Sequence, residues 1–359
     1  MKELAVSAPG RICLFGEHQD FLGLPVVAAA IDLRIYIEGT RRPDLLLRLD
    51  MPDIRAADEI DLSKPIVYAR SRDYLRACIN VLRRRGWDLS SGYDCRIYSA
   101  IPINAGVSSS SALTVAWLKF LLEASGHADA YSPDDLARLA HQAEVVEFGE
   151  PGGMMDHFAS ALGDVIYVDC RPPFRAEHLP LRLDGFVLGD SLENKETLGV
   201  LSDSKSDVQE GLRFLSQSCP GFDLHSTPAE AVSPLLDRLP EPVARKVRAN
   251  LINRDLTVEA MRLFREGVEP AKLGDLLTRH HERLRDGIGV STPKINRMVE
   301  AALDAGALGA KINGSGGGGC MFAYAPGRED AVAEALARVG GRAYKLSIDG
   351  GARVEAAKP

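Results

Sequence analysis

The strongest constraint on this chain is a glycine cluster near its C-terminal end, Lys311-Ile-Asn-Gly-Ser-Gly-Gly-Gly-Gly-Cys320. Five of six consecutive residues there are glycine, which loses more backbone entropy on folding than any other residue. Such a density indicates backbone with positive φ, or backbone that lies close to a ligand. Successive N–H groups in such a turn form a concave site for anions such as phosphate. The alternative, a flexible linker, is disfavoured because residues 307–311 and 321–325 flank the cluster like buried strands.

Composition narrows the class of protein. The 359 residues are 45% hydrophobic and 26% charged, enough for a sizeable core, and the length favours two domains. A net charge of −7 argues against coating nucleic acid but leaves nucleotide binding open. The six cysteines form no Cys-x-x-Cys pair, which suits reduced thiols in the cytoplasm and neither a disulfide frame nor a zinc site. We see no signal peptide, and the longest apolar run, 26–31, is too short to span a membrane.

The pattern of apolar residues predicts a mixed first half. Strands are expected at 4–8, 11–15, 26–31 and 33–38, assembled as a meander of hairpins, and then at 45–49, 93–101, 165–169 and 185–189. Helices are expected at 65–85, 112–123, 134–148 and 154–162.

The second half reads as mostly helical before it returns to strands. Helices are expected at 195–216, 228–236, 242–253, 257–266, 270–287, 293–305 and 329–339. Strands are expected at 309–312, 321–324 and 343–347. The sequence therefore predicts an α+β fold of two domains, residues 1–185 and 186–359, with helices packed on antiparallel or mixed sheets.

A run of four serines stands at the start of a predicted helix. Pro102-Ile-Asn-Ala-Gly106 breaks the preceding strand, and Ser108 to Ser111 lead into the helix at 112–123. One serine would suffice as an N-cap. Four supply hydroxyl and backbone N–H groups where the helix dipole favours anions. The order of strand, glycine loop, serines and helix predicts a phosphate or metal–phosphate site, although it is not a Walker loop.

Ionisable residues gather in Gly16-Glu-His-Gln-Asp20, between two predicted strands. The simplest structural interpretation of such a cluster is a solvent-exposed turn. The family resemblance described below implies instead that these side chains supply the paired donors and acceptors that a sugar site needs, because each buried hydroxyl without a partner costs about 1–3 kcal/mol. Metal binding by the histidines is disfavoured, since no two of them show the spacing of metal ligands.

Three stretches, taken in this order, resemble the motifs of the GHMP kinase superfamily, which includes galactokinase, homoserine kinase and mevalonate kinase. They are 9–20, 102–113 and 311–320. The resemblance is greatest to galactokinases, whose Gly-Arg-x-Asn-Leu-x-Gly-Glu-His-Thr-Asp-Tyr is here Gly-Arg-Ile-Cys-Leu-Phe-Gly-Glu-His-Gln-Asp-Phe. Their Gly-x-Met-Asp-Gln-Phe is here Gly-Met-Met-Asp-His-Phe, at 153–158. The resemblance implies a first domain like domain 2 of ribosomal protein S5 and a ferredoxin-like second domain with added helices.

The resemblance also implies a role for each matching residue. Asp156 would be the catalytic base, and Arg11 would keep it ionised and steady the transferring phosphoryl group. Glu144 and Ser110 would bind the Mg²⁺ that ATP carries. The residues expected to bind ATP are Gly106, Val107, Ser108, Ser109, Ser110, Ser111, Gly316 and Gly317. Those expected to bind the substrate are Glu17, His18, Asp20, Gly153 and Asp156. The glycine cluster would wall the cleft near Asp156 and Arg11.

Two departures from the galactokinase pattern leave the sugar open. The stretch 190–205 has neither the Tyr nor the Arg found there in galactokinases, and its Lys195 and Lys205 could instead pair with a uronic-acid carboxylate. Ser71 stands where many galactokinases have a Trp near adenine, three residues before a Tyr, here Tyr74.

We therefore expect a cytoplasmic enzyme, monomeric or homodimeric, that phosphorylates galactose or a related sugar or uronic acid at its anomeric hydroxyl with Mg²⁺ and ATP. One alternative is a silent sensor that binds sugar and ATP. Retention of the Arg, the Asp and the serine loop argues against it. The other alternative is a kinase for a non-sugar alcohol such as mevalonate, and the Glu-His-x-Asp and Met-Asp-x-Phe elements argue against that.

Overall fold

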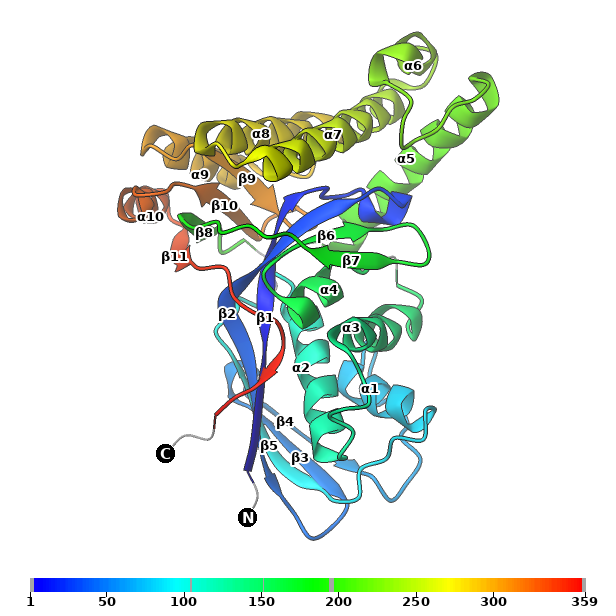
Figure 1. Cartoon of the computed structure of the whole chain (residues 1–359), viewed down its shortest axis with the longest axis vertical. Coiled ribbons are helices and arrows are strands. Elements are labelled where there is room, and N and C mark those ends of the chain that lie inside the picture. The colour runs from blue at the N-terminus through cyan, green and yellow to red at the C-terminus, as the bar shows by residue number, and fades with distance from the viewer. Residues whose placement is uncertain (1–2, 104, 151, 194–196, 357–359) are drawn as a thin grey trace.

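The computed structural model describes residues 3–103, 105–150, 152–193 and 197–356, with only the backbone described for 197–205. Its two sheets differ in size and position. Figure 1 shows the larger sheet extending along the long axis of the molecule, with the smaller sheet at one end of it.

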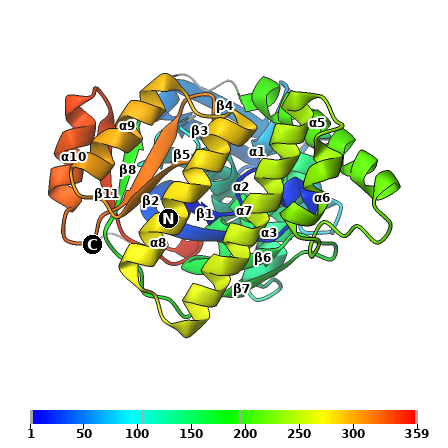
Figure 2. The same ribbon diagram turned by 90° about the horizontal axis from the view of Figure 1, so that it is seen from above.

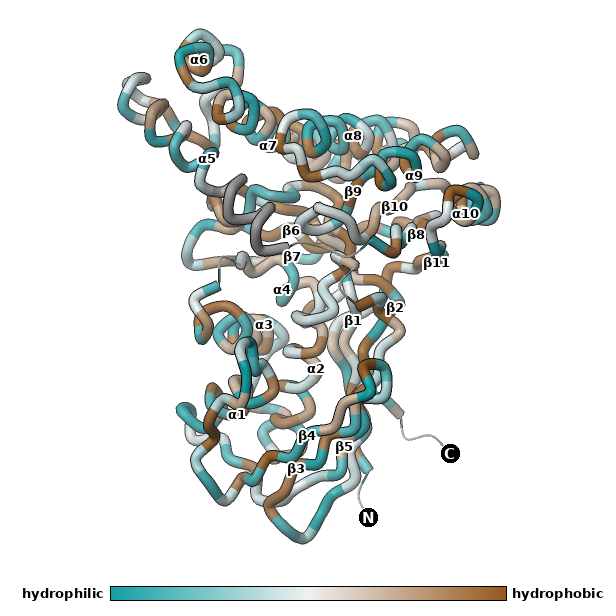
Figure 3. Tube along the Cα trace, turned by 180° about the vertical axis from the view of Figure 1, so that it is seen from behind, coloured by the Kyte–Doolittle hydropathy of each residue, from teal (hydrophilic) through white to brown (hydrophobic). Residues whose placement is uncertain are grey.

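In the described residues the larger sheet has eight strands, ordered β12-β1-β2-β5-β3-β4, with β6 paired to β2 and β7 to β6. The strands are β1 (Glu3–Phe15), β2 (Val26–Arg41), β3 (Leu46–Met51), β4 (Ala56–Asp61), β5 (Tyr93–Ser99), β6 (Val165–Asp169), β7 (Arg175–His178) and β12 (Arg353–Val354). Helices α2 (Ser109–Ala124) and α4 (Met155–Leu162) pack on it, while α1 (Tyr74–Arg83) packs on α2, and α3 (Pro133–His141) packs on both α2 and α4. Helix α2 is the central one, and Figure 3 shows apolar residues gathered along α2, β1 and β2.

The smaller sheet is antiparallel, with the order β11-β8-β10-β9. Its strands are β8 (Phe186–Asp190), β9 (Gly309–Asn313), β10 (Cys320–Tyr324) and β11 (Arg342–Leu346). The helices of this half are α5 (Thr197–Ser218), α6 (Ala229–Leu236), α7 (Glu241–Glu266), α8 (Pro270–Glu282), α9 (Pro293–Asp304) and α10 (Glu329–Arg338). Figure 2 shows α7 and α8 side by side at the end of the molecule. Among the described residues, no helix is both long and apolar enough to cross a bilayer.

The strands at the N-terminus are longer than predicted. The expected break at Pro9-Gly10 is only a shift of register within β1, and the strands expected at 26–31 and 33–38 are one strand, β2. Gly10 is needed for another reason, since a Cβ there would lie 2.8 Å from the carbonyl oxygen of Val107. The four strands expected to form a meander are thus a single antiparallel pair, β1 with β2, and the later strand β3 pairs with β5 in parallel. Strands β4 and β7, short and polar, were not predicted.

Two helix predictions fail because polar side chains override the local pattern. The helix expected from residue 65 begins at Tyr74, and the carboxylate of Asp73 accepts the N–H of Ala69, which holds the preceding segment as a loop. The helices expected at 242–253 and 257–266 are one helix, α7. Its polar centre is buried, with Arg254 donating to the carbonyl oxygen of Leu224 at 2.7 Å.

The predicted division into residues 1–185 and 186–359 stays a prediction. Strands β1 to β7 lie in the larger sheet and β8 to β11 in the smaller one. The chain then returns, because β12 pairs with β1 at the edge of the larger sheet. Residues 353–354 therefore belong to the same sheet as β1.

Candidate active site

A pocket of about 360 Å³ brings together most of the residues predicted from the sequence. It lies where the end of β1, the starts of α2 and α4 and the glycine cluster meet. The predicted residues that line it are Arg11, Glu17, His18, Asp20, Gly106, Ser108, Ser109, Ser110, Ser111, Glu144, Gly153 and Asp156. A larger hollow of about 1230 Å³ lies against β1 to β5 and is lined by none of these residues. The smaller pocket is therefore the candidate active site.

Arg11 and Asp156 form a close ion pair in this pocket. Nε of Arg11, on β1, donates to Oδ1 of Asp156, in the first turn of α4, at 2.8 Å. Nη1 donates to the carbonyl oxygen of Gly106 at 2.7 Å, so the same guanidinium also holds the loop before α2. Burial, the largest single influence, would raise the pKa of Asp156, but the charge of Arg11, a hydrogen bond from Ser108 and the influence of His157 together outweigh it, and the pKa lies below its usual value. The carboxylate is therefore ionised at neutral pH and can accept a proton.

The loop before α2 has the shape and polarity of a phosphate site. Gly106 and Ser108 have φ of 84° and 61°, and α2 begins at Ser109 with no acidic residue in its first turn. The predicted helix start at 112 was three residues late, because the serines themselves form the first turn. Free N–H groups and the helix dipole there favour an anion. Val107 is the exception to the prediction: it is fully buried and does not line the pocket.

The glycine cluster touches this loop at Gly314 and Gly319. A Cβ on Gly314 would lie 2.7 Å from the carbonyl oxygen of Gly106. The pocket is lined by Gly314 and Ser315. Gly316 and Gly317, predicted to bind ATP, turn away: Gly317 donates its N–H to the carbonyl oxygen of Val290 at 2.8 Å. Neither Gly316 nor Gly317 lines the pocket, and their role in binding ATP stays a prediction.

Asn313, which the sequence did not single out, joins β1 to the phosphate loop. Its Oδ1 accepts the N–H of Cys13, and its Nδ2 donates to the carbonyl oxygen of Gly106, both at 2.8 Å. The side chain is fully buried. The only feature of the sequence that pointed to this role of Asn313 was its position beside the glycine cluster.

Glu17 is engaged inside the protein by both of its oxygens. Oε2 accepts from Nζ of Lys311 and Oε1 from the N–H of Gly314, both at 2.9 Å. Lys311 is fully buried and also donates to the carbonyl oxygen of Cys13 at 2.8 Å. The carboxylate thus ties the predicted substrate loop to the glycine cluster, and a sugar hydroxyl would have to use its remaining lone pairs. A lysine within an otherwise apolar strand was the available signal for this pair.

Asp20 and Gly153 are in direct contact. A Cβ on Gly153 would lie 1.9 Å from Oδ2 of Asp20, so only glycine leaves this carboxylate in place. Oδ1 accepts the N–H of Phe21 at 2.9 Å. His18, whose φ is 61°, lines the pocket beside them. His18, Asp20 and Gly153 therefore line the same pocket, with Asp20 and Gly153 in contact.

Glu144 and Ser110 supply oxygen atoms of the kind that Mg²⁺ prefers. Oε2 of Glu144 lies 2.9 Å from Nε2 of His157, which fixes the orientation of the carboxylate. In the described part of the chain, no group of three or more His, Cys, Asp or Glu side chains could hold a metal by itself. The two residues fit a Mg²⁺ that keeps its other ligands from phosphate and water.

Tyr74, Lys195 and Lys205 were also named from the sequence. Tyr74 lines the pocket, as its predicted place near adenine requires, and Arg72 beside it forms an ion pair with Glu150. Lys195 and the side chain of Lys205, proposed for a uronic acid, lie outside the described residues.

Asp20→Asn is expected to stabilise the protein at pH 8 and to leave its stability nearly unchanged at pH 4. Burial, and then the charge of Asp156, raise the pKa of Asp20 to about 6. The folded protein holds this proton more tightly than the unfolded chain, so ionisation destabilises the wild type as the pH rises from the unfolded pKa toward the folded one. Thermal unfolding between pH 4 and 8 should show a Tm difference that opens with pH. A constant difference would contradict the raised pKa.

Comparison with known families matches three parts of the chain. The family described as “GHMP kinases N terminal domain” matches residues 73–164, and “GHMP kinases C terminal” matches residues 264–342. The “Galactokinase galactose-binding signature” matches residues 1–41, which include Arg11 and the predicted substrate loop.

Relatives carry two different names. A mevalonate kinase of Thermococcus sibiricus is 31% identical, over 98% of both chains. A galactokinase of Mannheimia succiniciproducens is 26% identical, over 90% of this chain and 86% of its own. The crystal structure of Lactococcus lactis galactokinase complexed with galactose superposes with a TM-score of 0.84, at 24% identity, over 98% of this chain and 95% of its own. The predicted two-domain fold is thereby confirmed, and the chain belongs to the GHMP kinase family.

Proposed function

We propose that this protein transfers the γ-phosphoryl group of ATP to the anomeric hydroxyl of galactose or a related neutral monosaccharide, giving sugar 1-phosphate and ADP. GHMP kinases are phosphotransferases that act on alcohol acceptors, and the sugar is the finer part of the proposal. The observation that carries it is the Arg11–Asp156 pair, placed in one pocket with a helix N-terminus rich in serine and with the residues of the galactose-binding signature.

Asp156 acts as the base in this proposal. As the hydroxyl oxygen of the sugar bonds to the γ-phosphorus, the bond from that phosphorus to the β–γ bridging oxygen breaks, and the hydroxyl proton passes to Asp156. The lowered pKa keeps the carboxylate of Asp156 ionised, and its ability to act as a base then depends on its distance to the sugar hydroxyl. Arg11 lies against the same carboxylate and balances negative charge as it develops.

The phosphates lie at the start of α2 in this proposal. Backbone N–H groups of the first turn, with the hydroxyls of Ser109 to Ser111, bind the phosphate oxygens. Mg²⁺, held by Ser110, Glu144 and ATP itself, neutralises phosphate charge when bound. Phosphoryl transfer needs little covalent help, so positioning and charge neutralisation suffice.

The charges of the pocket favour a neutral acceptor over mevalonate, which carries a carboxylate. Five described lining residues have carboxyl groups: Glu17, Asp20, Glu144, Glu150 and Asp156. The two lining arginines, Arg11 and Arg72, are each paired with one of them. Within the described lining, a carboxylate substrate would therefore meet acidic groups and arginines that are already paired. A sugar offers hydroxyls that suit the wall around Asp20. A uronic acid would need the lysines of 190–205.

Ser110→Ala is expected to raise the Mg²⁺ concentration for half-maximal activity by about tenfold, a loss typical of damage to a metal site. Titration of activity with Mg²⁺ at saturating ATP measures it. Ser125→Ala is the matched control, because Ser125 lies at the other end of α2 and its Oγ donates to the carbonyl oxygen of Leu122 at 3.1 Å. If both variants titrate like the wild type, Ser110 is not a metal ligand.

A panel of acceptors tests the function itself. ADP release would be measured with neutral hexoses, uronic acids, mevalonate and homoserine. We expect turnover with a neutral hexose and none with mevalonate. Turnover with mevalonate alone would establish the alternative kinase. Binding of ATP and sugar by calorimetry, with no ADP released from any acceptor, would establish a sensor.

A further inference from the structure

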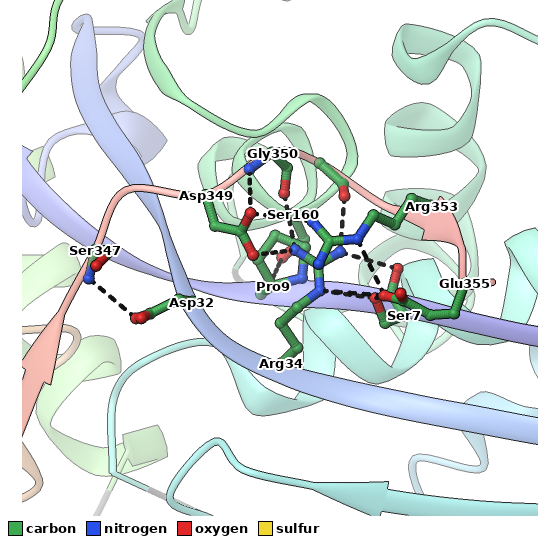
Figure 4. Close-up of polar contacts among 11 residues, drawn as sticks. Ser7, Pro9, Asp32, Arg34, Ser160, Ser347, Asp349, Gly350, Arg353 and Glu355 are labelled. Carbon is green, nitrogen blue, oxygen red and sulfur yellow. Dashed lines mark hydrogen bonds and ion pairs between the residues drawn. The ribbon is translucent and has the colours of Figure 1, made fainter. Parts of the chain in front are cut away.

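A buried arginine on β2 forms several hydrogen bonds with the C-terminal segment of the chain (Figure 4). Arg34 is 1% exposed, and its guanidinium donates to both oxygens of Ser7, to Oδ2 of Asp349 at 2.8 Å, and to the carbonyl oxygens of Gly350 and Gly351 at 2.9 and 2.8 Å. A buried charge is costly unless it is paired and fully hydrogen-bonded. Arg34 can therefore be buried only while residues 349–351 lie in place.

The same segment lies against the end of α4. The N–H of Asp164 donates to the carbonyl oxygen of Asp349 at 2.8 Å, and the N–H of Ala352 donates to that of Ala161 at 3.3 Å. A Cβ on Gly351 would lie 2.2 Å from the carbonyl oxygen of Ala161. The two backbones are thus as close as glycine permits, and the segment fixes where α4 ends.

Helix α4 is also tied to β1, and these two elements carry the catalytic pair. Oγ of Ser160 donates to the carbonyl oxygen of Pro9 at 2.8 Å, in the protein interior. Arg11 follows Pro9 by two residues on β1, and Asp156 lies one turn before Ser160 on α4. A helix rises about 1.5 Å per residue, so α4 is a short rod whose displacement at one end moves the other.

We propose that the C-terminal segment Ser347–Glu355, which is hydrogen-bonded to Arg34, positions Asp156 against Arg11 in the active site. This rests on the function proposed above. Arg34 and Asp349 are positioning residues, since neither lines the pocket. Both ends of the segment are anchored: the N–H of Ser347 donates to Oδ1 of Asp32 at 3.1 Å, and Glu355 accepts from Ser7.

Asp349→Ala removes one anchor of Arg34 and leaves the lining of the pocket unchanged. We expect kcat per folded molecule to fall about ten- to a hundredfold, as for a small misplacement of reacting groups, with little change in the KM for ATP. The acid limb of the kcat profile should move to higher pH, because Arg11 would lower the pKa of Asp156 less. In the described residues, the charged or titratable groups that interact with Asp156 are Arg11 and Cys13 on β1, Asp20 in the turn after β1 and His157 on α4 itself.

Val332→Ala separates positioning from loss of stability. Val332 is fully buried on α10, in the core beside the smaller sheet. If Asp349→Ala loses no more kcat than Val332→Ala at a matched loss of Tm, the proposal is overturned. Should Asp349→Ala not fold, Ser160→Ala provides the second test, with the same direction of change in kcat and in the acid limb; unchanged values in it would overturn the proposal.

A titration that needs no substrate distinguishes this proposal from the proposed function. The carboxyl of Asp156 can be followed by ¹³C NMR in the ligand-free protein, with Asp156→Asn to assign its signal. A higher pKa in Asp349→Ala supports the positioning role even if the wild type phosphorylates no sugar. An unchanged pKa together with unchanged kcat on a sugar would overturn the positioning role and leave the function standing.

Discussion

Asp156→Asn is expected to lower kcat by about two to four orders of magnitude, the usual contribution of a positioned base, while the KM for ATP stays close to that of the wild type. The amide cannot take the hydroxyl proton, yet it keeps the size and shape of the carboxylate beside Arg11. The phosphate loop, which holds ATP in our proposal, is left intact. Single-turnover kinetics with the sugar acceptor, alongside equilibrium binding of ATP, measures both quantities.

Asp164→Asn is the matched control for this experiment. Asp164 lies just beyond α4, its side chain is mostly exposed, and it does not line the pocket. Its kcat should equal that of the wild type. If Asp156→Asn retained wild-type kcat, the base would have to be another group, and the Arg11–Asp156 pair would be only a structural ion pair.

Lys311→Met is expected to destabilise the protein by about 3–5 kcal/mol, the cost of leaving one partner of a buried ion pair uncompensated. Lys311 is fully buried and Glu17 nearly so, with their charged atoms 2.9 Å apart. Because Glu17 also accepts from Gly314, the loss should loosen the contact between the substrate loop and the glycine cluster. Chemical denaturation measures the change in the free energy of unfolding.

Two further variants serve as controls for the stability loss expected of Lys311→Met. Lys345→Met breaks the exposed pair of Lys345 with Asp330 and should change stability little. The double variant Lys311→Met/Glu17→Gln removes both charges and should recover part of the lost stability. If the double variant is no more stable than Lys311→Met, the uncompensated charge of Glu17 is not the cause.

The sequence predicted what local chemistry determines. The serine run marked a helix N-terminus, and the helix expected from residue 134 is present as α3, capped by Ser132, whose Oγ accepts the N–H of Asp135 at 3.1 Å. The strands on either side of the glycine cluster are the predicted ones and are buried throughout. These features depend on a few neighbouring residues, so a single sequence reveals them.

What the sequence could not predict depends on residues far apart in the chain. Gly10 breaks no strand, because its role is to admit the carbonyl oxygen of Val107. Of the five glycines in the cluster, Gly314 and Gly319 contact the phosphate loop, because the chain passes Gly106 and Ala105 at these two positions. The partner of Glu17 is almost three hundred residues away. Periodicity carries no information about such pairings.

The identity of the product tests the proposed function most directly. The protein would be incubated with ATP, Mg²⁺ and galactose, and the product examined by ³¹P NMR with proton coupling. We predict a phosphomonoester coupled to the anomeric proton, and none when mevalonate replaces the sugar. A phosphate on another carbon of the sugar, or phosphorylation of mevalonate instead, would contradict the proposal that this GHMP kinase acts on the anomeric hydroxyl of a neutral sugar.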